Sequence, residues 1–207
     1  MTQNQRFNAE AVVVTVPLGV LKNGDIQFTP ALPPRHQAAI KNLGMGTLNK
    51  LILEFPEGTW IPNAEFITTN RSYSDLGKAP CNFYINYQYY GNRPILVGLI
   101  GGEFAPYFET LSNEAVTKLA MDDLRGGFGE KVPMPTSIHL TRWGQDPFSR
   151  GSYSGLPIGS SSHDRMALNV PINDQLYFAG EATDVHDYGT IHGAYFSGLR
   201  TARAILE

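Results

Sequence analysis

Short apolar runs and alternating stretches along the chain predict a series of β-strands. The first run, AVVVTV at residues 11–16, is continuous and β-branched, which is typical of a strand buried on both faces. In residues 82–89 aromatic and apolar side chains alternate with polar ones, so this strand should have one drier face. The same criteria predict further strands at 47–55, 65–69, 94–102, 136–143 and 176–179.

Two helices are predicted from their start signals, and a third from the spacing of its small residues. Pro33 and Pro34 open a helix through Lys41. Ser112 is a good N-cap for a helix to about residue 126, with Ala115, Leu119 and Leu124 turned inward. A C-terminal helix follows residue 189. Several strands come consecutively between helices, which predicts an α+β fold with a mixed or antiparallel sheet flanked by helices.

Composition narrows the classes of function. The 207 residues are 42% hydrophobic and 17% charged, which suits one domain or one and a half with a real core. The formal net charge of −3 gives no sign of a nucleic-acid partner. The single cysteine, Cys81, excludes an internal disulfide, and the five histidines lack metal-ligand spacing, so no metal site is expected. A polar start and the lack of a long apolar run favour a cytoplasmic protein without a membrane span.

The C-terminal segment LYFAGEATDVHDYGTIHGAYFSGLRTARAILE combines an apolar run, a glycine turn and a helix rich in small residues. A strand, a glycine and a helix N-terminus together can hold an anion through backbone N–H groups. The alternative is a C-terminal helix that packs on a sheet through its small residues. The pattern alone does not decide between them.

The sequence of this segment, FAGEAT followed by GTIHGAYFSGLRTA, resembles the C-terminal FAD-binding signature of the flavin-containing amine oxidases. That family includes polyamine oxidases, monoamine oxidases and lysine-specific histone demethylases. Residues 12–55 resemble the family's entry into its substrate domain, and LRGGFG and TRWGQDPFSRGSYS resemble its next landmarks. Four motifs in the family's order make chance similarity unlikely.

The family's N-terminal strand–GxGxxG–helix unit, which holds the ADP part of FAD, has no counterpart here. The resemblance therefore implies the C-terminal half of an amine oxidase. It implies a strand of the FAD-binding domain at 1–21, a substrate-binding domain at 22–145, and at 146–207 the C-terminal strand and helix of the FAD-binding α/β domain. The sequence does not distinguish three origins of such a half: a fragment, a truncated reading frame, or one part of a split enzyme.

The resemblance assigns roles to three side chains. Lys50, inside the apolar strand LNKLILEF, matches the family's lysine that holds a water next to the flavin N5; without the resemblance, an outward-pointing strand lysine would be expected. Trp143 would pack close to the flavin, although a core anchor is the alternative. Tyr153 would form an aromatic wall on the substrate face of the flavin, with a solvated turn tyrosine as the alternative.

Further family positions fall in the C-terminal segment. Thr190 stands where monoamine oxidases place a second cage aromatic, a departure that resembles some polyamine oxidases and the histone demethylases. Ile191 would offer its backbone N–H to the flavin pyrimidine carbonyl, and Gly180 and Glu181 would offer theirs to the pyrophosphate. In that role the glycine should matter more than the Glu181 carboxylate.

Other candidates are weaker. His186 and His192 are expected to serve the turn rather than a metal. Four tyrosines could line a substrate channel, although a half-buried aromatic strand face is the simpler interpretation. They are Tyr84, Tyr87, Tyr89 and Tyr90.

The resemblance implies an FAD-dependent oxidase that converts an amine C–N bond to an imine while O2 is reduced to H2O2. A polyamine-like small molecule is the favoured substrate. A histone-demethylase role is not favoured, since no chromatin-binding insertion or basic patch is visible. The alternative is a non-catalytic substrate-domain module without bound FAD. Such a module would form a homo-oligomer or pair with a missing N-terminal FAD-binding chain through exposed apolar surface.

Overall fold

The computed structural model describes residues 5–60, 63–69, 80–81, 83–91 and 93–207. The chain forms two compact units, each described by itself below. The first unit comprises residues 1–46 and 147–207, and the second comprises 47–146. The boundary expected after residue 21 thus falls inside the first unit, because the helix Pro34–Asn42 (α2) packs against the helix Ser162–Leu168 (α6).

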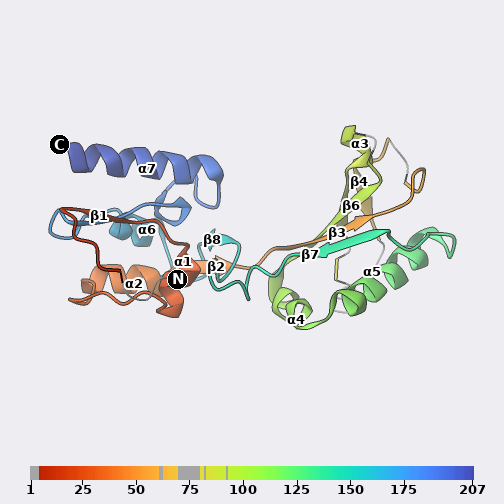
Figure 1. Ribbon diagram of the computed structural model, residues 1–207, viewed down its shortest axis with the longest axis horizontal. Coiled ribbons are helices and arrows are strands. Elements are labelled where there is room, and N and C mark those ends of the chain that lie inside the picture. The colour runs from red at the N-terminus through yellow and green to blue at the C-terminus, as the bar shows by residue number, and fades with distance from the viewer. Residues whose placement is uncertain (1–4, 61–62, 70–79, 82, 92) are drawn as a thin grey trace. The chain divides into compact units, whose positions relative to one another are not determined.

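The second unit contains a five-stranded antiparallel sheet in the order β4-β5-β6-β3-β7. Two helices, α4 (Ala105–Thr110) and α5 (Asn113–Phe128), lie along the same side of this sheet (Figure 1). The α+β fold class predicted from the sequence is confirmed. The strands are β3 (Asn49–Glu54), β4 (Phe66–Thr68), β5 (Phe83–Asn86), β6 (Ile95–Ile100) and β7 (Ser137–Leu140).

Burial alternates along β3, an interior strand of this sheet. Asn49, Leu51 and Leu53 are buried, whereas Lys50 and the other alternate residues are only half-buried. Since successive side chains of a strand point to opposite faces, Lys50 lies on the face away from the core. That core joins the sheet to α5 through Leu51, Leu53, Leu96, Val116, Met121 and Leu124, among others.

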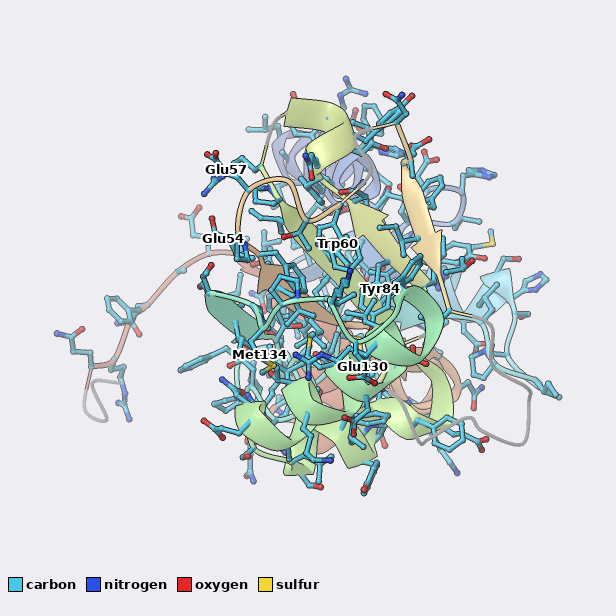
Figure 2. The ribbon with its side chains drawn as sticks, turned by 90° about the vertical axis from the view of Figure 1, so that its right-hand side faces the viewer. Glu54, Glu57, Trp60, Tyr84, Glu130 and Met134 are labelled. Atoms are coloured by element: carbon cyan, nitrogen blue, oxygen red, sulfur yellow. The ribbon has the colours of Figure 1, made fainter. Side chains whose placement is uncertain are left out.

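Strand β5 has one buried face, but it is the face of Tyr84 and Asn86 rather than that of the alternate apolar residues. Tyr84 is fully buried against Gly98, where an added Cβ would lie 2.9 Å from the tyrosine ring. The Asn86 amide donates to the Ala64 carbonyl at 2.7 Å, so its burial costs little. Figure 2 labels Tyr84 and Trp60, two buried members of this core, and Glu57, which is exposed.

Helix α5 begins as predicted. The Ser112 Oγ accepts a hydrogen bond from the Ala115 N–H at 3.2 Å, as an N-cap should. The predicted inward face is largely confirmed, because Leu124 is buried and Leu119 packs against the core, whereas Ala115 is only half-buried. The same face also buries Val116, Ala120 and Met121.

The first unit has two small pairs of strands. Parallel strands β1 (Val12–Val14) and β9 (Leu176–Phe178) form one, and antiparallel strands β2 (Gly44–Gly46) and β8 (Tyr153–Gly155) form the other. The strand predicted at 11–16 is present, but Val12 and Val13 are 50% and 39% exposed, so burial on both faces was wrong. A two-strand pair leaves this apolar surface uncovered within the unit.

Helices lie on both sides of the β1–β9 pair (Figure 1). Helix α7 (Ile191–Leu206) lies on one side and α2 on the other, with the short helix α1 (Leu18–Asn23) beside α2. The core of the first unit consists of the apolar residues Leu18, Ala39, Leu43, Leu168 and Ala182. Residues 144–162 include strand β8 and end at the capping box of α6. In the described part of the chain, no helix is both long and apolar enough to cross a membrane.

Candidate functional site

The Gly180 turn follows strand β9 directly. Its backbone angles, φ 133° and ψ 166°, belong to a region that only glycine adopts without strain. The Gly180 N–H donates to the Ser197 Oγ of α7 at 2.8 Å, so this N–H already has an acceptor within the chain. An added Cβ would meet open space, so this backbone remains open on one side.

The Glu181 carboxylate joins two segments of the first unit. Its Oε1 accepts from the Ser154 N–H at 2.9 Å, and its Oε2 accepts from the Ser154 hydroxyl and the Gly189 N–H, both at 2.6 Å. Such charge-assisted bonds are short and strong. The side chain of Glu181 thus fixes strand β8 to the loop before α7, a role that the sequence analysis missed.

A buried arginine supports this carboxylate. Arg165 of α6 is fully buried, and its Nη1 donates to the Ser154 Oγ at 2.7 Å and to the Ala182 carbonyl at 2.9 Å. Its guanidinium lies 3.9 Å from the centre of the Tyr188 ring. Burial lowers the pKa of Arg165, and the negative charge of Glu181 opposes that shift. The one available sequence signal was a lone arginine in the apolar half of a capped helical segment.

Thr190 is the N-cap of α7. Its Oγ1 accepts from the Gly193 N–H at 3.0 Å and donates to the Asp187 carbonyl at 2.5 Å. Gly193 permits this turn, because an added Cβ would lie 2.1 Å from the Asp187 carbonyl oxygen. The adjacent Ile191 is 90% exposed.

Tyr153 lies beside the start of this turn. A Cβ added to Gly189 would lie 3.5 Å from the Tyr153 Cδ2, and the Tyr153 ring is 43% exposed. The structure therefore brings Tyr153 close to the segment that ends in Thr190. These are the two positions expected to face a substrate.

Lys50 and Trp143 belong to the second unit. The Lys50 backbone pairs with Leu99 of β6, and its side chain lies on the half-buried sheet face. Trp143 follows β7 and is 37% exposed, while its N–H donates to the Asn49 Oδ1 at 3.0 Å. Trp143 is thus a partly exposed side chain on a well-anchored backbone rather than a core anchor.

The tyrosines do not share one environment. Tyr84 is buried in the core, whereas Tyr87, Tyr89 and Tyr90 are exposed near helix α3 (Gln88–Gly91). The Tyr90 hydroxyl donates to the Glu65 carboxylate.

The His192 Nε2 lies 3.3 Å from the Asp187 carboxylate. The described residues include no group of three or more His, Cys, Asp or Glu side chains that could hold a metal ion.

Within the first unit, two backbone features that the sequence predicted lie in the C-terminal segment. The open side of Gly180 follows a strand end, and the 16-residue helix α7 begins nearby with a capped N-terminus and an exposed Ile191. A strand end, a glycine and a helix N-terminus are backbone features that can hold an anion.

Comparison with known proteins gives the family. Residues 1–206 match the family model described as flavin containing amine oxidoreductase. The chain therefore belongs to this family, whose cofactor is FAD, and the predicted resemblance is confirmed.

Among curated relatives, "Lysine-specific histone demethylase 1 homolog 2" of Arabidopsis thaliana is 43% identical over 99% of this chain and 28% of its own length. "Lysine-specific histone demethylase 1 homolog 1" of Oryza sativa subsp. japonica is 40% identical over 100% of this chain and 24% of its own. The chain thus spans only a minor part of these relatives.

Two solved structures show the same fold. Putrescine oxidase bound to putrescine aligns with a TM-score of 0.76 and 21% identity over 96% of this chain and 43% of its own. Cyclohexylamine oxidase from Brevibacterium oxydans IH-35A gives a TM-score of 0.74 and 22% identity over 98% and 44%.

These comparisons do not support the polyamine preference. The relatives near 40% identity carry the name of histone demethylases. The lack of a chromatin-binding insertion in this chain does not count against such a role, because the chain covers only 28% and 24% of these two relatives.

Proposed function

We propose that this chain supplies the flavin- and substrate-facing half of an FAD-dependent amine oxidase. Family membership over residues 1–206, with the Gly180 turn leading to the capped helix α7, carries this proposal. When bound, FAD would supply the oxidation of an amine C–N bond to an imine and the reduction of O2 to H2O2.

The residues proposed to hold FAD are of two kinds. Gly180, Glu181 and Ile191 would contribute backbone at the strand end and at the start of α7. Because the Gly180 N–H is engaged by Ser197, Gly180 would serve mainly by its open backbone, and the N–H of Glu181 is the donor of this pair that we assign to the pyrophosphate. Trp143 would offer its partly exposed indole as a packing surface.

Three side chains are proposed to act on the substrate side. Lys50 would hold a water molecule and move its proton through an ammonium that is only half-buried. Tyr153 would orient the amine and exclude water with its exposed ring. Thr190 would leave room for the substrate beside the Tyr153 ring, because the Thr190 hydroxyl is occupied in capping α7.

The proposed substrate class is an aliphatic amine that carries an N-alkyl group. Methylated lysine, suggested by the names of the relatives, and polyamines share this chemistry. A threonine in place of a second cage aromatic suits a long aliphatic chain better than a compact arylalkylamine.

The test is the visible absorption spectrum of the purified chain, recorded after incubation with FAD and desalting. Retained flavin bands that bleach anaerobically with a monomethyl-lysine peptide or with spermine would support the proposal, and the faster amine would define the substrate. Retained bands that no alkylated amine bleaches would contradict it.

A second candidate function rests on the exposed apolar surface of the first unit. Tyr195, Phe196 and Leu206 of α7 are 64%, 51% and 86% exposed, and the β1 valines are also uncovered. Monomeric proteins seldom leave such surface open. A non-catalytic module would pair through it with an N-terminal FAD-binding chain or a second copy. A colourless chain that forms concentration-dependent oligomers in analytical ultracentrifugation would favour this alternative.

A further inference from the structure

A buried carboxylate in the second unit holds the turn that carries Trp143. Glu109 of α4 is 5% exposed, and its Oε1 accepts from the Asn49 Nδ2 at 2.7 Å and from the Gly144 N–H at 2.8 Å. An added Cβ at Gly144 would lie 2.9 Å from the Glu109 Oε2, so a larger residue there would have to displace the carboxylate. A buried charge is costly unless it is hydrogen-bonded, and this carboxylate receives two donors on one oxygen.

Asn49 connects this carboxylate to the backbones of Trp143 and Lys50. Its side chain is 1% exposed, and its Oδ1 accepts from the Trp143 N–H at 3.0 Å and from the Thr141 hydroxyl at 3.1 Å. The Thr141 Oγ1 in turn accepts from the Lys50 N–H at 2.8 Å. One continuous set of hydrogen bonds therefore runs from the Lys50 backbone to the Trp143 backbone.

The backbone carbonyl of Glu109 also holds the turn that carries Trp143. The Glu109 carbonyl accepts from the Arg142 Nε at 3.2 Å and from the Gln145 Nε2 at 3.0 Å. The four consecutive residues 142–145 thus each donate to Asn49 or Glu109, while the Trp143 indole remains partly exposed. Polar anchoring of a backbone that presents an exposed aromatic ring is what a positioning device requires.

We infer that Glu109 and Asn49 are positioning residues, which set the Trp143 indole relative to the strand that carries Lys50. This inference rests on the proposed function, in which Trp143 packs near the flavin and Lys50 acts beside it. An apolar core would have served stability alone, because well-packed hydrophobic residues often replace buried polar groups without loss. Neither Glu109 nor Asn49 is assigned a role of its own by the family motifs considered above.

The test uses fluorine NMR of the full chain labelled with fluorotryptophan. The chain has two tryptophans, so Trp143 gives one resonance and the buried Trp60 gives the other, which reports the fold of the same unit. A Trp143→Phe variant assigns the signals. No flavin is needed, so failure of this inference is separate from failure of the proposed function.

In Glu109→Leu we expect the Trp143 resonance to shift and broaden while the Trp60 resonance stays in place. In Glu109→Gln an oxygen can remain at the Oε1 position and keep both hydrogen bonds, so the parent spectrum should return. A Trp143 resonance that is unchanged in a folded Glu109→Leu chain would overturn the inference. So would a Gln variant that is displaced as far as the Leu variant.

A milder pair of variants covers the case in which Glu109→Leu does not fold. Gly144→Ala places a methyl group against the Glu109 carboxylate and should shift the Trp143 resonance alone. Gly126→Ala, on α5 of the same unit, adds a methyl group in open space and should shift neither signal. Equal spectra for the two alanine variants would also overturn the inference.

Discussion

Ser154 donates both its backbone N–H and its hydroxyl to the carboxylate of Glu181, at 2.9 and 2.6 Å. The same carboxylate accepts from the Gly189 N–H, so one side chain connects the strand of Tyr153 to the loop that begins α7. Since Arg165 donates to the Ser154 hydroxyl, the cation and the carboxylate share a neutral bridge. The position of the Tyr153 ring beside Gly189 depends on this connection.

Replacing Glu181 by glutamine should loosen both segments. An amide presents one oxygen and one N–H₂ group, so it cannot accept all three donors, and Arg165 loses its nearby negative charge. We expect a loss of about 1–3 kcal/mol of stability in the first unit. Hydrogen exchange should show faster exchange of the Ser154 and Gly189 amides. Glu10→Gln, at an exposed position of the same unit, is the control; equal exchange in both variants would refute the role.

Two glycines of α7 should respond oppositely to alanine. At Gly193 an added Cβ would lie 2.1 Å from the Asp187 carbonyl oxygen, whereas at Gly198 it meets open space. We expect Gly193→Ala to destabilise by about 1–3 kcal/mol and Gly198→Ala to stabilise by up to about 1 kcal/mol, because alanine is the better helix former. Thermal unfolding followed by circular dichroism measures both. The same sign for the two variants would show that the Asp187 contact does not constrain the helix.

Thr190 should contribute to stability through its hydroxyl. Thr190→Ala removes the acceptor for the Gly193 N–H and should cost about 1 kcal/mol, whereas Thr190→Ser keeps the oxygen and should stay close to the parent chain. Denaturant unfolding followed by circular dichroism compares the two. If serine is as destabilised as alanine, the methyl group rather than the cap carries the effect.

Much of the architecture could be predicted because local signals and tertiary packing agree. Ser112 caps α5 and Pro34 begins α2, since both residues satisfy the backbone of a helix start whatever packs against it. The face of β5 could not be predicted this way. Tyr84 and Asn86 became the buried side because Gly98 leaves room for the tyrosine and the Ala64 carbonyl accepts from the asparagine, both of which are contacts distant in sequence.

The site shows the same division. The family motifs predict roles for Lys50, Tyr153 and Gly180, but no motif indicated that Arg165 of α6 would support Glu181 or that Glu109 of α4 would hold Gly144. The hydrogen bonds from Arg165 to Ser154 and from Gly144 to Glu109 join residues that are 11 and 35 positions apart, and neither pair has a recognisable spacing. Polar side chains that become buried through such contacts carry no local sequence pattern.

His36 makes the stability of the first unit depend on pH. The ring is fully buried on α2, its Nε2 donates to the Val170 carbonyl at 2.9 Å, and its Nδ1 has no hydrogen-bond partner among the described residues. Burial lowers the pKa of His36 below its ordinary value of 6.5, and the charge of Arg35 adds to this, while the bond to Val170 opposes it. Protonation at Nδ1 would place a charged donor in the core without an acceptor.

The direction of the pH effect follows from this shift. Above pH 6.5 the ring is neutral in both states, so its contribution to folding is fully present. As the pH falls below 6.5, the unfolded chain takes up a proton that the folded chain resists. Stability therefore declines until the lower, folded-state pKa is reached, by at most about 1.4 kcal/mol per pH unit for one proton.

Urea unfolding followed by circular dichroism from neutral to mildly acidic pH measures this decline. His36→Gln can keep a donor to the Val170 carbonyl without a titrating group, so it should be less stable at neutral pH but flatter with pH. His163→Gln, at an exposed position of α6 in the same unit, should keep the parent's slope. If the free energy of unfolding of His36→Gln falls with pH as steeply as that of the parent chain, a group other than the His36 ring causes the pH dependence.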